Sequence, residues 1–467
     1  MVFSDLFFLY AFIPLCMLFY FIWKNITWKN VILVVFSLLF YAWGEPLWII
    51  ILLFSTAANY GCGLLIEKFR GTPKAKLGVV ISLTVSLGLL ATFKYTNFIV
   101  ENLNMILPFE IPSPNIALPI GISFYTFQII SYILDAYWGK VEVQRSPLKF
   151  LMFVSLFPQL VAGPIVRYGV IEKEINERHS TSTDISEGMT RFIIGLGKKV
   201  ILANNLATVV EATLGGNMGT LSVFGCWYGV ICYAMQVYFD FSGYSDMAIG
   251  LGRIFGFHFN ENFNYPFICK NITEFWQRWH ISLGSFFRDY LLYVPIFGKR
   301  RQYLSLFLVW FCTGMWHGAS WNYIIWGLYF GVFIFIERKI GNKRLRQIPT
   351  AITHIYSKIV IVLGFGIFYF EDLGRLGQFF AGLVGANGNA LTDTASQTTF
   401  MNNVFLFAAS VILCMPVIPK FKKWLMTKSA GAAVSGMTQI VCNAALLAVC
   451  SIMLVNNTNN PFLYQTF

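Results

Sequence analysis

The chain of 467 residues has little charge: only 12% of its residues are Asp, Glu, Lys or Arg, against about 25% in an ordinary soluble domain. So few charges do not coat the water-facing surface of a soluble protein of this size. The scarcity excludes a soluble enzyme, a disordered chain and a nucleic-acid-binding protein, although the formal net charge is +12. Hydrophobic residues make up 57% of the chain and aromatic residues 18%, as in helices that face lipid between two aromatic belts. The composition predicts an integral membrane protein.

Several motifs of known chemistry are also missing. The nine cysteines show no C-x-x-C spacing and lie mostly in apolar runs, so we interpret them as small hydrophobic residues. The five histidines show no metal-ligand spacing, and the chain has no G-x-S-x-G, P-loop, H-E-x-x-H or His-x4-Asp motif. These absences argue against a serine hydrolase and a metalloenzyme, so no metal and no bound cofactor are expected.

Long apolar runs are the main feature that is present. Several are shorter than the roughly 20 residues that cross a bilayer core of about 30 Å, so some helices must be tilted, broken or re-entrant. We therefore predict an all-α membrane protein of about 11–13 helices, with 1–467 forming one membrane domain. The first run is expected to be a retained span, because it has neither the basic start nor the cleavage site of a signal peptide. The runs lie at about 5–23, 31–43, 46–66, 77–100, 116–138, 148–166, 190–210, 222–239, 303–316, 321–337, 355–370, 402–418 and 433–455.

The distribution of Lys and Arg predicts the orientation in the membrane. Basic residues follow the first, third and fifth runs, whereas the loop at 101–115 after the fourth run holds two acids and no base. Under the positive-inside rule this alternation places the N-terminus outside and the basic loops in the cytoplasm. A modest attraction for anionic lipid is an alternative explanation of the excess of bases.

His317 is the sharpest candidate for a functional residue. It lies between the runs at 303–316 and 321–337, and basic clusters flank the outer ends of both, which predicts a helical hairpin. A run of about 14 residues rises only about 21 Å, so the connection that holds His317 is expected at membrane depth. A neutral imidazole there can take a proton from a hydroxyl and return it to a leaving group. The alternative is a structural histidine packed between tryptophans.

His280 lies in a stretch at 253–301 that contains no clean span and is either a cytoplasmic excursion or a set of broken helices around a cavity. On a continuous helix, Trp276 and His280 share a face, as do Glu274 and Arg278. The functional interpretation of this helix competes with that of an interfacial anchor held by ion pairs.

Further polar side chains interrupt apolar runs. Asp240 and Asp246, with Ser242 between them, follow the run at 222–239 and suit an ion path, an acid/base role or a polar network. The polar breaks at 121–128 and 163–167 suit a cavity lining or structural helix breaks equally. A proton-coupled transporter with Asp240, Asp246 and His317 as a relay stays open.

Over these segments the sequence resembles the membrane-bound O-acyltransferase superfamily and, within it, the bacterial alginate O-acetyltransferase group. The resemblance extends from the start of the chain to about residue 340, whereas 341–467 contains no motif. The matching stretches are MVFS at 1–4, FYAW at 40–43, LPIGISFY at 118–125, FPQLVAGP at 157–164, YFDFSGYSDMAIG at 238–250, ENFN at 261–264, EFWQRWHISL at 274–283, RDYL at 288–291 and WHGA at 316–319.

The resemblance implies a ring of helices around a central tunnel, with His317 as the essential histidine of the superfamily and His280 as a second one. It implies a multi-pass protein of the bacterial plasma membrane that passes an acyl group from a cytoplasmic thioester, acetyl-CoA or an acyl carrier protein. The acceptor is an extracytoplasmic polysaccharide, reached through a partner acyltransferase. D-alanyl transfer to teichoic acid is the alternative reaction. The other candidates for binding substrate or lining the tunnel are Trp316, Asn322, Asp240, Ser242, Asp246, Trp276, Arg278 and Asp289.

Overall fold

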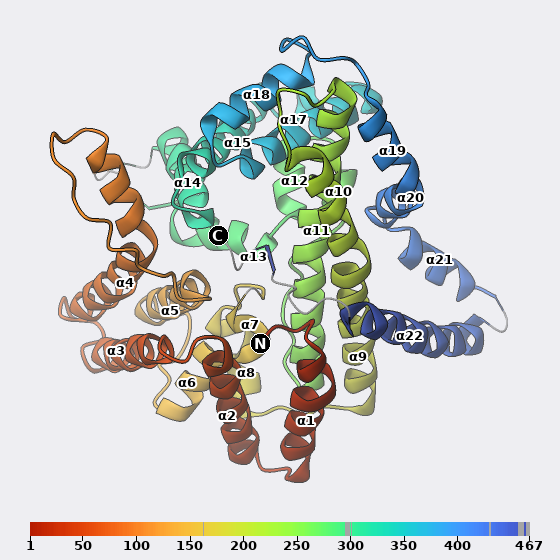
Figure 1. Ribbon diagram of the computed structural model, residues 1–467. Helices are drawn as coiled ribbons and strands as arrows, with labels where there is room; N and C mark the ends of the chain where they lie inside the picture. The colour runs from red at the N-terminus through yellow and green to blue at the C-terminus, as the bar shows by residue number, and fades with distance from the viewer. Residues whose placement is uncertain (162, 295–298, 300, 429–430, 456–461, 464–467) are drawn as a thin grey trace. The chain divides into compact units, whose positions relative to one another are not determined.

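The computed structural model describes residues 1–161, 163–294, 299, 301–428, 431–455 and 462–463. All regular structure in these residues is helical and none of it is a β-strand, so the predicted all-α fold is confirmed (Figure 1). The chain divides into two compact units. The first unit holds 1–192 and 245–261, and the second holds 193–244 and the described residues from 262 to 455.

The first unit is built mainly from the N-terminal helices. Two long helices of this unit, α3 and α4, pack side by side and are joined by polar contacts, as is common between helices in a membrane. Asn59 of α3 donates to Ser86 Oγ of α4 over 3.1 Å and accepts a hydrogen bond from Ser82. The elements are a π-helical turn η1 (Phe8–Phe12), α1 (Ile13–Ile22), α2 (Ile26–Gly44), α3 (Ile49–Lys68), α4 (Ala75–Asn104), α5 (Ile122–Tyr137), α6 (Pro147–Ser155), α7 (Phe157–Leu160) and α8 (Tyr168–Asn176).

Two helices contribute residues to both units, and the remaining elements belong to the second. The shared helices are α9 (Ser182–Gly197) and α11 (Val223–Ile254). The others are η2 (Lys198–Ala203), α10 (Asn204–Leu214), η3 (Pro266–Ile268), α12 (Ile272–Arg278), α13 (Ile281–Tyr290), α14 (Gln302–His317), α15 (Trp321–Ile340), α16 (Asn342–Leu345), α17 (Thr350–Tyr369), α18 (Leu373–Leu383), α19 (Thr394–Asn402), α20 (Val404–Leu413), α21 (Val417–Leu425) and α22 (Gly431–Val455).

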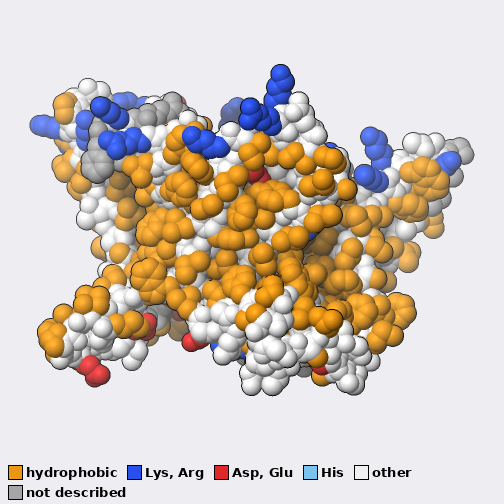
Figure 2. All heavy atoms as spheres, turned by 90° about the horizontal axis from the view of Figure 1, so that it is seen from above, with side chains coloured by type: hydrophobic (Ala, Val, Ile, Leu, Met, Phe, Trp, Pro, Cys, Tyr) orange, Lys and Arg blue, Asp and Glu red, His pale blue; other side chains and the backbone are white. Residues whose placement is uncertain are grey.

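Six helical segments of the described chain are long and apolar enough to cross a membrane, and a seventh is possible if the bent pair α20 and α21 is one span. Each predicted apolar run contains a helix, and several are short or broken as expected: the run at 148–166 holds both α6 and α7. Hydrophobic side chains cover most of the face shown in Figure 2. The protein is therefore a multi-pass membrane protein.

Two boundaries differ from the sequence-based prediction. The helix α11 does not end at Phe239 but continues through Asp240 and Asp246 to Ile254, because both carboxylates find cationic partners, described below. The run at 116–138 becomes helical only at Ile122, after Gly121 with φ +77°.

The predicted hairpin around His317 is present as α14 and α15, which pack closely together (Figure 1). Gly314 of α14 lies against Gly327 and the backbone of Tyr323 on α15, and Gly327 in turn lies against the backbone of Trp310. A Cβ atom at either glycine would collide with the facing backbone. The hairpin is therefore held together at a contact where small residues let two helices approach.

Candidate active site

His317 is the last residue of α14 and is 97% shielded from solvent, with a relative exposure of 3%. Its ring meets aromatic neighbours edge to face: Trp326 of α15 lies 4.8 Å away and Phe368 of α17 lies 5.3 Å away, centroid to centroid. The preceding Trp316 lies 4.9 Å from it. Three aromatic rings thus fix the orientation of the imidazole in an environment of low polarity, where an acid–base group acts without competing water.

His280 does not continue the helix that bears Trp276, so the predicted arrangement of Trp276 and His280 on one helix face is wrong. The helix α12 ends at Arg278, and His280 adopts a left-handed conformation with φ +45° before α13 begins. This conformation is costly for a residue with a Cβ and persists only where surrounding contacts stabilise it. The break turns the His280 side chain into the buried interior, where its relative exposure is 1%.

Asn262 stabilises this turn from a segment 18 residues earlier in the chain. Its backbone carbonyl accepts from Ile281 N over 2.9 Å, and its Oδ1 accepts from the backbone N and the hydroxyl of Ser282. The same Oδ1 lies 3.2 Å from Nδ1 of His280. Because an amide oxygen only accepts hydrogen bonds, Nδ1 of His280 carries the proton, and Nε2 of the neutral ring keeps its lone pair.

Trp316 connects the two histidines. Its ring centroid lies 5.5 Å from that of His280 and 4.9 Å from that of His317, so both histidines flank one indole. The opposite side of His280 packs edge to face on Phe241 at 4.6 Å. The structure therefore brings the two sequence-predicted histidines and Trp316 into one buried cluster within the second unit.

Trp276 and Asn322 border this cluster. The Trp276 ring contacts Trp310 at 4.8 Å and Trp326 at 5.5 Å, which continues the aromatic packing from His317 toward α12. Asn322 is fully buried and donates through Nδ2 to the backbone carbonyls of Ile367 and Phe368. Asn322 therefore fixes the end of α17 and, with it, the phenyl ring that contacts His317.

Other predicted site residues are engaged in ion pairs. Asp240 pairs with Lys199 at 2.6 Å, and both side chains are buried, which favours the polar network among the alternatives for this segment. Ser242, two residues after Asp240 on α11, is also buried. In the first unit, Asp246 pairs with Arg191 at 2.9 Å, and Arg191 also pairs with Glu261.

The two predicted surface charges near α12 and α13 have local partners. Arg278 pairs with Glu274 at 2.9 Å, as the spacing of four residues predicts, and also donates to the backbone carbonyl of Asn264. Asp289 accepts from the neighbouring Arg288 at 2.7 Å, and this hydrogen bond raises the pKa of the Arg288 guanidinium.

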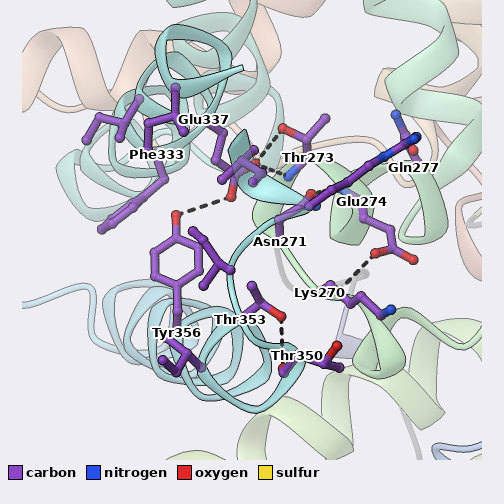
Figure 3. Close-up of a pocket in the computed structure, with 16 residues that line it drawn as sticks. Lys270, Asn271, Thr273, Glu274, Gln277, Phe333, Glu337, Thr350, Thr353 and Tyr356 are labelled. Carbon is purple, nitrogen blue, oxygen red and sulfur yellow. Dashed lines mark hydrogen bonds between the residues drawn. The ribbon is translucent and has the colours of Figure 1, made fainter. Parts of the chain in front are cut away.

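Glu337 is a buried acid whose importance the sequence did not reveal. Its carboxylate accepts from the backbone N–H groups of Ile272 and Thr273 at 2.7 and 2.8 Å, from the Thr273 hydroxyl and from the hydroxyl of Tyr356 (Figure 3). An acid at this place completes the N-terminus of α12, where the free N–H groups and the helix dipole favour negative charge. Glu337 thereby ties α15 to α12, whose other end leads into His280.

A pocket of about 820 Å³ opens beside Glu337, between α12, α15 and α17. Figure 3 shows its polar groups, among them Lys270, Asn271 and Gln277, and Arg346 adds a second cation. Among the residues that the structure describes, no group of three or more His, Cys, Asp or Glu is placed to hold a metal ion. The pocket is large enough for a flexible organic ligand.

Three functional positions were missed because their partners are distant in the sequence. Asn262 belongs to the ENFN stretch, but nothing in that stretch indicates which later residue its side chain contacts. Glu337 stands next to Arg338 and Lys339, so the sequence alone indicates only a charged helix end. Lys199 lies inside the apolar run at 190–210, and a base in such a run is the one signal from which a buried partner could be inferred.

The chain is similar to known proteins over most of its length. Residues 141–370, which contain both histidines, match the model of the membrane-bound O-acyltransferase family. The probable alginate O-acetylase of Pseudomonas aeruginosa is 40% identical over 80% of this chain and 73% of its own length. The peptidoglycan O-acetyltransferase of Helicobacter pylori is 34% identical over 86% of this chain and 84% of its own length. The teichoic acid D-alanyltransferase of Bacillus subtilis is 32% identical over 56% of this chain and 69% of its own length.

Proposed function

The chain belongs to the membrane-bound O-acyltransferase family, and from that premise we propose that it passes an acetyl group from a cytoplasmic thioester to a hydroxyl of an extracytoplasmic polysaccharide. The names of the alginate and peptidoglycan O-acetyltransferases support acetyl as the group and a glycan as the acceptor. The whole chain, 1–467, acts as one membrane domain in the plasma membrane of a bacterium, with its N-terminus outside. The acceptor hydroxyl belongs to the polysaccharide itself or to a partner acyltransferase that delivers the acetyl group to it.

The observation that carries the proposal is the cluster in which His280 and His317 flank Trp316. In the proposed step, His317 takes the proton of the acceptor hydroxyl while the hydroxyl oxygen attacks the thioester carbonyl carbon. The C–O bond forms, the C–S bond breaks, and the imidazolium returns the proton to the departing thiolate. No oxidant or further reactant is needed, and general base catalysis of this kind contributes about 10²- to 10⁴-fold in rate.

His280 is assigned a positioning role toward the donor or toward His317. Asn262 contacts its Nδ1 and thereby orients the ring in the cluster. Trp316, Trp276 and Asn322 hold the rings around the histidines. Ser242, Arg278, Asp240, Asp246 and Asp289 remain candidates for lining the tunnel, although four of them are paired with local charges.

The donor is acetyl-CoA or the thioester of an acyl carrier protein. We place its entry at the pocket of Figure 3, because Lys270 and Arg346 supply cations for a phosphate-bearing donor. On the helices that border this pocket, Phe330, Trp276 and Trp326 form successive ring contacts of 5.0 and 5.5 Å, and Trp326 contacts His317 at 4.8 Å. In this proposal the acyl chain moves along these three rings, which we call the aromatic wall, to the histidine.

The substitution His317→Ala tests the catalytic role. We expect acetylation of the glycan to fall by about 10²-fold or more, in protein that inserts and expresses like the wild type. His179→Ala is the matched control, because His179 is exposed and lies outside the cluster. Unchanged acetyl content of the polysaccharide in the His317→Ala strain would refute the role of His317 as general base.

The second candidate is D-alanyl transfer to teichoic acid, which the relative from Bacillus subtilis supports. Mild alkaline hydrolysis of the cell wall, followed by identification of the released ester groups, separates the two: acetate supports the first proposal and D-alanine the second. Substrate uptake into proteoliposomes without acyl turnover would instead support the transporter alternative.

A further inference from the structure

The helix α21 (Val417–Leu425) has no buried residue, unlike most other helices of the described chain. It follows α20 at a bend of 66° and precedes α22, and Figure 1 shows the change of direction between the three. With ten residues, α20 rises only about 15 Å and does not cross the bilayer core by itself. The bend turns α21 away from the direction in which α20 would have to continue in order to cross the membrane.

The two faces of α21 differ sharply in chemistry. At 100° per residue, Val417, Ile418, Phe421, Trp424 and Leu425 fall on one face, and the exposed fractions of the first four are 43, 62, 59 and 54%. The opposite face carries the lysines at 420, 422 and 423.

The charge of this region has one sign. The sequence contains no Asp or Glu after Asp393, whereas four lysines lie between 420 and 428. Lys422 contacts a neutral partner, Gln439 of α22, at 3.0 Å, and Lys428 lies 5.1 Å above the ring of Trp424. The last part of the chain therefore neutralises none of its own positive charge.

We propose that α21 lies in the membrane interface and binds anionic phospholipid, with its apolar face among the acyl chains and its lysines at the phosphate groups. Long lysine side chains reach from a helix axis to the headgroups while their stems stay in apolar surroundings. The neighbouring α22 has a stretch that is long and apolar enough to span, only 11% of which is buried, so its side chains also face lipid. This inference goes beyond the proposed acyl transfer and does not depend on it.

An acidic soluble protein is the competing partner for a basic helix. The apolar face decides against it, because a water-soluble partner that contacts the lysines leaves four large, exposed hydrophobic side chains without cover. A bilayer covers that face and binds the lysines at once. Each lysine near an anionic leaflet adds about fivefold to binding.

The test reconstitutes the full chain in vesicles of equal parts phosphatidylcholine and phosphatidylglycerol. After gentle detergent extraction, mass spectrometry measures the ratio of the two lipids that stay bound. We expect wild type to be enriched in phosphatidylglycerol, and K420Q/K422Q/K423Q to lose at least about fivefold of that enrichment. The control K68Q/K74Q/K76Q removes the same charge from exposed positions at the end of α3, in the turn that follows it and at the start of α4, and should change the ratio by less than about twofold.

A second measurement distinguishes a loss of lipid binding from misfolding of K420Q/K422Q/K423Q. Hydrogen exchange of the peptide 417–425 in wild type should be slower in phosphatidylglycerol vesicles than in pure phosphatidylcholine, and Phe421→Ser with Trp424→Ser should abolish that difference while keeping every lysine. Equal lipid ratios in wild type and K420Q/K422Q/K423Q would overturn the proposal. The proposal would also be contradicted if an acidic acyl carrier protein bound wild type but not this variant, while the ratio of bound lipids was the same for both proteins.

Discussion

At the scale of single residues, the sequence pointed to both histidines, and the structure places them around one tryptophan. It could not indicate the partners that orient them. Asn262 contacts His280 from 18 residues away in the sequence, and Glu337 contacts Thr273 from 64 residues away. Helical spacing relates residues three or four apart, so contacts of this range become visible only once the chain has folded.

Asn262→Asp should move the pH dependence of acyl transfer. A carboxylate beside Nδ1 favours the protonated imidazole, so His280 would lose its proton only at higher pH than in wild type. Burial lowers the pKa of His280 to about 3 in wild type, and the added carboxylate raises it, so we expect the rate of the variant to fall toward pH 5 more steeply than that of wild type. Single-turnover transfer to a small acceptor, measured between pH 5 and 9, records the difference.

Asn262→Ala is the companion variant, because it removes the acceptor without adding charge. It should lower the rate and leave its pH dependence nearly unchanged. If Asn262→Asp also lowered the rate without changing the pH dependence of that rate, Asn262 would only stabilise the fold of the turn.

At the scale of elements, apolar runs predicted the long helices and the hairpin of α14 and α15. They predicted that some helices are short or broken but did not locate the breaks: α12 and α13 meet at the left-handed His280, and α6 and α7 are separated at Leu156. Periodicity averages over several turns, so a break made by one residue leaves no trace in it. The stabilising contacts of such a break come from other segments, as with Asn262.

Gly327→Leu should force α14 and α15 apart, because the facing backbone of Trp310 leaves no room for a side chain. We expect a loss of about 1–3 kcal/mol of stability, seen as a lower midpoint of thermal unfolding in detergent, together with reduced acyl transfer. Gly88→Leu on α4 is the control, since nothing lies within 4 Å of a Cβ atom there. Equal midpoints for the two variants would contradict the close helix contact.

Glu337→Gln should loosen the connection between α15 and α12. The amide keeps the shape of the side chain but turns an NH₂ group toward N–H donors and removes the negative charge at the helix start. We expect a loss of about 1–3 kcal/mol of stability and a slower reaction, because α12 leads to His280. Glu110→Gln, at an exposed loop position, should alter neither quantity. A wild-type unfolding midpoint in Glu337→Gln would show that this carboxylate does not secure α12.

At the scale of the whole molecule, composition alone predicted a multi-pass helical membrane protein, since a chain with 12% charged residues has too few charges for a wet surface. Composition could not predict the division into two units or the split of short runs into several helices, because both depend on which surfaces pack together. The orientation remains a prediction from the distribution of bases.

That orientation can be tested by labelling cysteines in intact cells. On a Cys442→Ser background, which removes an exposed native thiol, Glu110→Cys should react with a membrane-impermeant maleimide, whereas Lys74→Cys should react only after the membrane is permeabilised. Both positions are exposed in loops. The opposite pattern would invert the orientation and place the donor pocket outside.

The aromatic wall beside His317 has an optical consequence. Trp276 and Trp310 lie 4.8 Å apart at 66°, and Trp326 joins them at 5.5 Å from Trp276. Indoles this close share their excited states, so the site should produce a paired positive and negative band in the circular dichroism of the intact protein. A ligand that enters along the wall would change that pair of bands, and the protein would report occupancy of its own site without any added dye.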